Sequence, residues 1–341
     1  MGAITGTTRP RLALVIVVLV MGACSSGRAA PPPASQTSGS PQPTRSSSPS
    51  PPVEALEPVA RTPLSGGTAT GLAVADGALW VIHFEDGVLS RVDPAGGVET
   101  AASAVVPNGT SLTSLAGRLW IAHDSMGAGQ SALVAVDPSS GRIAKEITVP
   151  GVCCQAASAG GSVWTVDPRG TLLRLDPSRG EIEGETSVEL DAVNGHIDLA
   201  GDDRGLWIAS DTTPLTRVDA ETGKIVKRVD VGGGIPMRLQ ADLLWGASPH
   251  HLWAIDPATG RIALSFELAD TIETFSIAVT DGAIWVAARR PGHVGTVRRY
   301  DQATHMLTGQ ADVALPARLE FAFGDIWVLD AESNEVLRFD P

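Results

Sequence analysis

Histidine and cysteine, two residue types able to do acid–base, metal or redox chemistry, are few in this sequence, with seven His and three Cys. Histidine can transfer protons near neutral pH or bind a metal through a ring nitrogen. Arginine can hold a carboxylate or phosphate through paired N–H donors, and a thiol can change its redox state. The residues concerned are His83, Glu85, Asp86, Asn108, Thr110, His123, Asp124, Cys153, Cys154, Asn194, His196, Arg289, Arg290 and His293.

The histidines also have ordinary structural interpretations. His196 either contacts a ligand or is held by hydrogen bonds at the rim of a channel. His83 and His123 could bind a metal with Asp124 or Glu85. No CxxC or HxH spacing supports such a site, so no metal and no cofactor is assigned.

Two pairs of adjacent residues carry further chemistry. Arg289 and Arg290 either hold a carboxylate or phosphate or are solvated surface charges. Cys153 and Cys154 are bridged to each other, free as thiols, or metal ligands. Consecutive Cα atoms are about 3.8 Å apart, less than the usual disulfide span. A bridge here would therefore be strained and easily reduced.

The elements that must position these residues belong to a unit that recurs seven times. Each copy has four short runs rich in Val, Ile, Leu and Thr, separated by Gly, Asp and Pro, a pattern typical of strands joined by tight turns. Seven such units predict an all-β fold, a seven-bladed β-propeller over residues 53–341. The recurring markers are Trp80, Trp120, Trp164, Trp207, Trp245, Trp285 and Trp327, with Asp93, Asp137, Asp176, Asp219, Asp256, Asp301 and Asp340.

Residues that recur from copy to copy are explained by the fold. The seven tryptophans are expected to pack between blades, each with a partner for its indole N–H. Trp253 is additional and is expected in the core. Each recurring Asp is expected to bond the backbone of its own turn. Five arginines precede that Asp by two residues and are expected to form ion pairs or packing contacts: Arg91, Arg174, Arg217, Arg299 and Arg338.

Nearly all the singular polar residues fall on one face of the predicted ring. Connections from strand 1 to 2 and from strand 3 to 4 share one face and are short. The other connections vary, and the strand 2 to 3 loops are expected to be longest in blades 2 and 6. Variable loops on a rigid scaffold often bind ligands, although surface loops are also simply polar. The predicted ligand-binding residues are His83, Asn108, His123, Asp124, Cys153, Cys154, Asn194, His196, Arg289 and His293.

The last unit stops after its third strand, so its fourth strand must come from elsewhere. The segment Pro58-Val-Ala-Arg-Thr-Pro63 resembles the fourth-strand segments of other units. We therefore expect an N-terminal strand to complete the last blade and remove its unpaired edge.

The unit resembles a known family of repeats in Leu206-Trp-Ile, Arg217-Val-Asp, Thr222-Gly-Lys-Ile-Val and Val231-Gly-Gly-Gly. These motifs are similar to YVTN-type propellers and to the streptogramin (virginiamycin B) lyase superfamily, over residues 53–341. The lyase resemblance implies two His in neighbouring blades, a nearby Glu and a divalent metal. His196 could supply one His. Segments 235–240 and 271–279 contain no His, and their only acid is Glu273.

Residues 1–23 are predicted to be a secretory signal peptide. Arg9 and Arg11 precede an apolar run over residues 12–21, which is too short to span a bilayer. Gly22 and Ala23 before Cys24 resemble a bacterial lipobox, so Cys24 is the predicted lipidation site. Cleavage near residues 29–30 is the alternative. Residues 24–52 then form a Pro/Ser-rich disordered linker that carries the domain away from the membrane.

The sequence favours a monomeric, non-catalytic binding propeller at the outer face of the bacterial cytoplasmic membrane. A small molecule, a glycan or a peptide would bind at the variable face. The formal charge of −13 argues against nucleic acid as a partner. The alternative is an enzyme, either lyase-like and metal-dependent or similar to a quinoprotein propeller.

Overall fold

A computed structural model describes residues 52–341, apart from 125–130, 150–155, 168–169, 189–196 and 211–213. In this part every regular element is a strand, and no helix is long and apolar enough to cross a membrane. The predicted signal peptide, the linker and Cys24 lie outside the described residues, as do Cys153, Cys154, Asn194 and His196.

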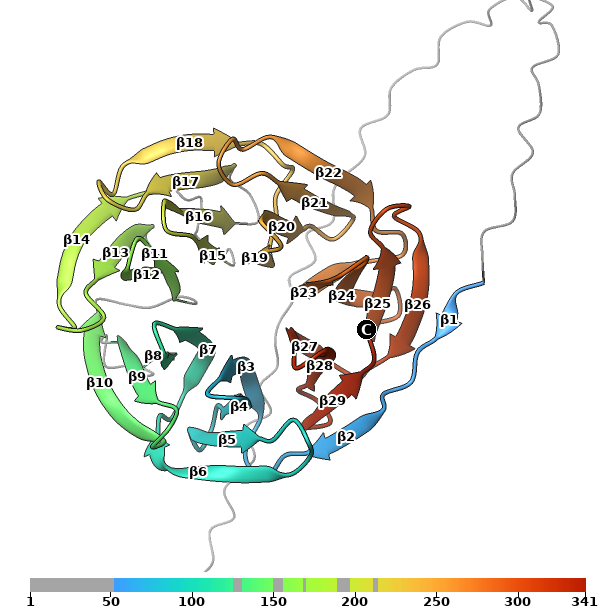
Figure 1. Cartoon of the computed structure of the whole chain (residues 1–341), viewed down its shortest axis with the longest axis horizontal. Coiled ribbons are helices and arrows are strands. Elements are labelled where there is room, and N and C mark those ends of the chain that lie inside the picture. Colours follow the sequence, from blue (N-terminus) through green and yellow to red (C-terminus); the bar gives the residue numbers. More distant parts are fainter. Residues whose placement is uncertain (1–51, 125–130, 150–155, 168–169, 189–196, 211–213) are drawn as a thin grey trace, which may run out of the picture. The chain divides into compact units, whose positions relative to one another are not determined.

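Seven sheets stand side by side in a ring, each with its first strand innermost (Figure 1). This confirms the predicted seven-bladed propeller. Blades 1 to 3 contain β3 (Ala69–Ala75), β4 (Ala78–His83), β5 (Val88–Val92), β6 (Val98–Val105), β7 (Gly109–Leu115), β8 (Arg118–Asp124), β9 (Ser131–Asp137), β10 (Arg142–Val149), β11 (Ala157–Ala159), β12 (Ser162–Val166), β13 (Thr171–Leu175) and β14 (Ile182–Ser187). Blades 4 to 6 contain β15 (Ile197–Gly201), β16 (Gly205–Ser210), β17 (Leu215–Asp219), β18 (Ile225–Val229), β19 (Met237–Gln240), β20 (Leu243–Ala247), β21 (His251–Ile255), β22 (Ile262–Glu267), β23 (Glu273–Thr280), β24 (Ala283–Arg290), β25 (Val294–Asp301) and β26 (Leu307–Asp312). Blade 7 contains β27 (Pro316–Ala322), β28 (Asp325–Asp330), β29 (Glu335–Phe339) and β2 (Ala60–Pro63).

The N-terminal strap, residues 53–64, closes the ring as predicted. Its strand β2 pairs antiparallel with β29 through four residue pairs. The buried Leu64 side chain packs with Trp327 and Val336 at the junction of blades 7 and 1. One feature was not predicted: β1 (Glu54–Ala55) adds a short parallel strand to β26 in blade 6. The strap therefore fastens two blades.

Each recurring Trp stabilises the hairpin that joins the first two strands of its blade. All seven are buried to 2% exposure or less. In five blades the indole N–H donates to the carbonyl five residues earlier, as from Trp80 to Ala75 at 3.0 Å. The indole nitrogens of Trp207 and Trp285 have no partner among the described residues. The predicted packing role is confirmed, and the predicted indole partner is present in five of the seven.

These hairpins turn through left-handed residues, which Gly, Asn and Asp tolerate best. Asp76 and Gly77 have φ of 48° and 68°, whereas blade 7 places Phe323 at 56° before Gly324. Phe323 is 46% exposed, and a bulky residue in this region costs about 1 kcal/mol or more. We expect Phe323→Asn to raise the melting temperature by about 2 °C. Asp76→Asn is the matched control and should change little. A lower melting temperature for Phe323→Asn would contradict the strain argument.

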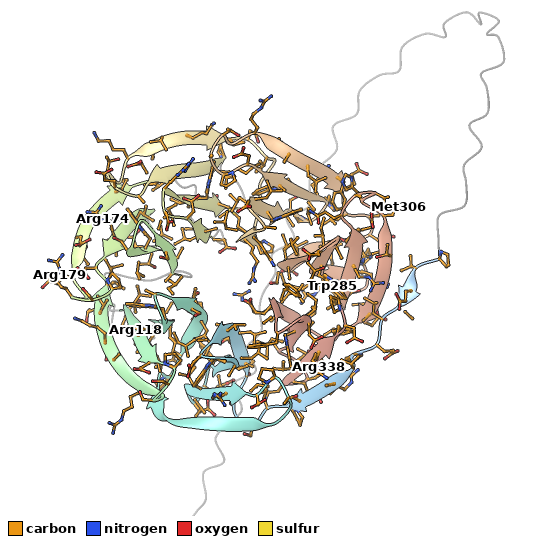
Figure 2. All side chains as sticks on the ribbon, in the orientation of Figure 1. Arg118, Arg174, Arg179, Trp285, Met306 and Arg338 are labelled. Atoms are coloured by element: carbon orange, nitrogen blue, oxygen red, sulfur yellow. The ribbon has the colours of Figure 1, made fainter. Side chains whose placement is uncertain are left out.

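The recurring Asp residues bond their own turns, and three of the recurring Arg residues reach the turn of the next blade. Asp176 accepts hydrogen bonds from the Ser178 hydroxyl and amide, and these bonds hold the pKa of its carboxyl well below its usual range. Arg174 lies over the Trp164 ring at 5.9 Å and donates to the Glu221 carbonyl in the next blade. Arg217 and Arg338 each lie over the Trp ring of their own blade and donate to a carbonyl of the next blade. Arg174 and Arg338 are labelled in Figure 2. The predicted turn bonds are confirmed for six of the seven recurring Asp. The predicted packing is confirmed for Arg174, Arg217, Arg299 and Arg338.

Trp253 is 1% exposed, which confirms the expected core position. Its indole donates to the Gly233 carbonyl at 3.1 Å. A Cβ on Gly234 or Gly246 would lie within 2.4 Å of the indole ring. Gly234, just before blade 5, and Gly246 in β20 are therefore required by a fully packed Trp.

Candidate functional site

The predicted blade 1 site is a set of loop contacts. His83 is fully buried, with Nδ1 donating to the Gly67 carbonyl at 2.8 Å and Nε2 accepting from the Ser90 hydroxyl at 2.9 Å. Because the Gly67 carbonyl can only accept a hydrogen bond, we assign the ring proton of His83 to Nδ1. Glu85 accepts from the amide and hydroxyl of Thr68. These side chains hold Gly67 and Thr68, the residues between the N-terminal strap and β3.

The blade 2 candidates lie near one another but form no complete site within the described chain. His123 pairs with Gly109 across the blade, in the place that His83 occupies in blade 1. Its Nδ1 is buried and has no hydrogen-bond partner among the described residues. Asn108 is half-buried with a left-handed φ of 60°. Asp124 ends β8, and its side chain lies outside the described part.

In blade 6 the predicted anion-binding arginines are already paired. Arg289 donates to Glu273 at 2.6 Å and lies 5.0 Å from the centre of the Phe275 ring. Arg290 pairs with Asp312. His293 is exposed in the turn between β24 and β25.

The expectation of a long blade 6 loop was wrong. Only residues 291–293 separate β24 from β25, and each of these strands has eight residues. The additional residues extend the strands because apolar side chains continue the ladder up to Ala288, which is fully buried.

A comparison of equivalent positions reveals a different site. The recurring Trp of each blade pairs with one residue of the innermost strand. That residue is Arg238 in blade 5 and Glu320 in blade 7. Two blades thus place long charged side chains where the others have a small one. The five small residues are Ala73, Thr113, Ala157, Ala200 and Ala278.

Arg238 and Glu320 form a two-point ion pair between blades 5 and 7. Nη1 and Nη2 of Arg238 donate to the Glu320 carboxylate at 2.8 and 2.6 Å. The side chains are 27% and 17% exposed. Burial acts against the charge of Arg238, but attraction to Glu320 outweighs it and raises the arginine's pKa. The pair therefore links two blades that are not neighbours in the ring.

Asp198 and Arg318 lie two residues nearer the start of their strands and complete a four-residue group that we call the axial cluster. Asp198 is 6% exposed, and this burial raises its pKa despite two backbone amide donors and both guanidinium groups. Burial lowers the pKa of Arg318, and repulsion from Arg238 adds to the effect. First strands begin at the face of the variable loops, so Asp198 and Arg318 lie on that side of the cluster.

The sequence analysis did not predict the axial cluster, because its four residues lie on strands and none is a histidine. The available signal was the charge of Arg238 and Glu320 at a position that is Ala or Thr in every other copy. Such a group could orient a polar ligand by charge and hydrogen bonding. Among the described residues, no group of three His, Cys, Asp or Glu could hold a metal ion.

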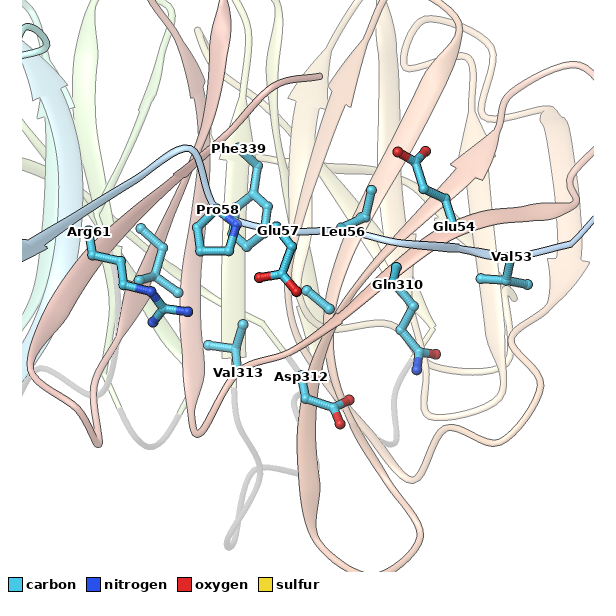
Figure 3. A pocket seen from close by; sticks show the side chains of 13 residues that line it. Val53, Glu54, Leu56, Glu57, Pro58, Arg61, Gln310, Asp312, Val313 and Phe339 are labelled. Carbon is cyan, nitrogen blue, oxygen red and sulfur yellow. The ribbon is translucent and has the colours of Figure 1, made fainter.

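A separate pocket of about 520 Å³ lies against the N-terminal strap (Figure 3). Its lining includes Leu56, Glu57, Asp312 and Phe339. None of the predicted site residues and none of the axial cluster borders it. The pocket therefore belongs to the ring closure.

Comparisons with known proteins confirm the predicted fold and its lyase-like resemblance. Virginiamycin B lyase from Staphylococcus aureus has a TM-score of 0.64 and 17% identity, over 83% of this chain and 98% of the lyase. A streptogramin B lyase structure has a TM-score of 0.63 and 15% identity, over 82% and 96%. A chain of the mitotic checkpoint complex has a TM-score of 0.63 and 13% identity, over 86% and 96%. No family model and no curated protein matches the sequence.

At these identities the likeness shows a seven-bladed propeller and nothing finer, because this fold carries many unrelated functions. The neighbours therefore do not assign a reaction or a ligand to this chain.

Proposed function

We propose that the chain is an exported, lipid-anchored protein whose propeller binds a small ligand without transforming it. The observation that carries this proposal is the axial cluster. Alanine would serve packing equally well at the positions of Arg238 and Glu320, because four other blades have alanine there. Desolvating four charged groups costs free energy that stability alone does not require.

The cluster also lies where a propeller can receive a ligand. Its outer members, Asp198 and Arg318, are nearest the ends at which the first strands begin. The loops that connect strands at that face vary in sequence, and variable loops on a rigid scaffold often bind ligands. We place the ligand there and propose that the protein acts as a monomer with no nucleic-acid partner.

Native mass spectrometry of the full chain, purified from its own cells, tests the binding function. We expect the wild type to retain an additional mass. Arg238→Ala combined with Glu320→Ala should lose it, because the charged pair at the proposed ligand site is removed. The net charge of the protein stays the same in this double variant. Arg204→Gln, at an exposed turn on the opposite face, should keep it. No retained mass in the wild type would contradict the proposal.

A lyase-like enzyme is the second candidate, because two of the similar solved structures are lyases. The same experiment separates the two functions. Recovery of the retained compound with an altered mass after incubation with fresh protein would replace the binding function with an enzymatic one.

Lipid anchoring is a separate prediction that rests on residues 12–24. Cys24→Ala should move the protein from the membrane fraction to the soluble fraction or block its maturation, because the acylated sulfur is removed. Fractionation and intact mass measure both outcomes. Cys24→Ala that remains in the membrane with an unchanged lipid mass would contradict the proposed anchor.

A further inference from the structure

In the axial cluster, one of the two guanidinium groups makes no hydrogen bond to either carboxylate of the cluster. Arg238 uses two donors on Glu320, at 2.8 and 2.6 Å. Asp198 receives the Leu199 amide on Oδ1 at 2.9 Å and the Met237 amide on Oδ2 at 2.7 Å. Both carboxylates of the cluster are thus held by other groups.

Arg318 is the remaining member. Within the described chain its guanidinium makes one hydrogen bond, from Nη1 to the Ala317 carbonyl at 3.2 Å. A guanidinium has five N–H donors in a planar fork. The residue is half-buried, and its lowered pKa reflects a positive charge that its surroundings stabilise incompletely.

From this geometry we infer that Arg318 binds a carboxylate group of the ligand. A planar carboxylate matches the free edge of the guanidinium and can accept two parallel hydrogen bonds. Arg238 stays with Glu320, and Asp198 stays with its backbone donors, so Arg318 can change partner without breaking the cluster. The inference deepens the proposed function and rests on it, because it gives the chemical class of the ligand.

Isothermal titration of the full chain with N-acetylglycine tests the inference at fixed ionic strength. N-acetylglycinamide is the matched probe, with the carboxylate replaced by a neutral amide. We expect saturable binding of the acid only. Arg318→Gln should weaken that binding about tenfold or more, because the charge-assisted hydrogen bonds to the carboxylate are lost. Arg204→Gln should bind as the wild type does.

Arg318→Lys keeps the charge and removes the planar fork, so its affinity should fall between those of Arg318→Gln and wild type. It also carries the test if Arg318→Gln does not fold. Equal binding of both probes, no binding of the acid, or an unchanged affinity in the Arg318 variants would overturn the inference.

The two proposals fail separately. A native ligand retained by the wild type, without carboxylate binding at Arg318, leaves the proposed function standing and removes the inference. Carboxylate binding at Arg318 without any retained native ligand establishes the anion site and contradicts the proposed function.

Discussion

A chain that begins at Gly66 is expected to melt about 10 °C below one that begins at Pro52. The shorter chain loses β2, its four pairs with β29 and the buried side chains of Leu56 and Leu64. Each buried Leu contributes about 1.5 to 3 kcal/mol. The strand edge of blade 7 would also be left unpaired. Calorimetry or circular dichroism measures the difference.

Single substitutions in the strap separate packing from chain length. Leu64→Ala should lower the free energy of unfolding by about 2 to 4 kcal/mol, because its side chain is enclosed by Trp327 and Val336. Val59→Ala is the matched control, since Val59 is 48% exposed in the same strap. Equal stability of the chains beginning at Gly66 and Pro52 would show that the ring does not need this strand.

Glu320→Ala is expected to destabilise the propeller by about 2 to 4 kcal/mol. The substitution leaves Arg238 without its carboxylate, and an unpaired charge in a desolvated place is costly. The partial exposure of the pair keeps the loss below that of a fully buried ion pair.

Arg238→Ala combined with Glu320→Ala should recover most of that stability. The double variant gives blades 5 and 7 the residue that four other blades have at this position. Urea unfolding of the two single variants and the double variant measures the coupling. Losses that simply add would show that the two residues do not stabilise one another.

The repeat made the architecture predictable. Seven copies of the same Trp and Asp specify seven blades, and the missing fourth strand indicates where the chain must close. Residues that recur from copy to copy have structural roles, because each of the seven blades packs in the same way.

The site was predictable only in part. The role of His83 depends on its contact with Gly67, which directly follows the strap that closes the ring. No local sequence pattern reveals that contact. Arg238 and Glu320 are 82 residues apart, and their meeting depends on the radius of the ring. The chemistry of a propeller axis is therefore visible in sequence only after the copies are aligned on their Trp.

The strap also determines how mechanical load would enter the domain. Residues before 52 join the propeller through β1 and β2, the same segment that completes blade 7. A pull from that side would first act on two pairs with β26 and then on four with β29. The segment that closes the ring is thus also the segment through which the force arrives. Tension would detach the strap and open the ring between blades 7 and 1, while the other six blades keep all their own strands.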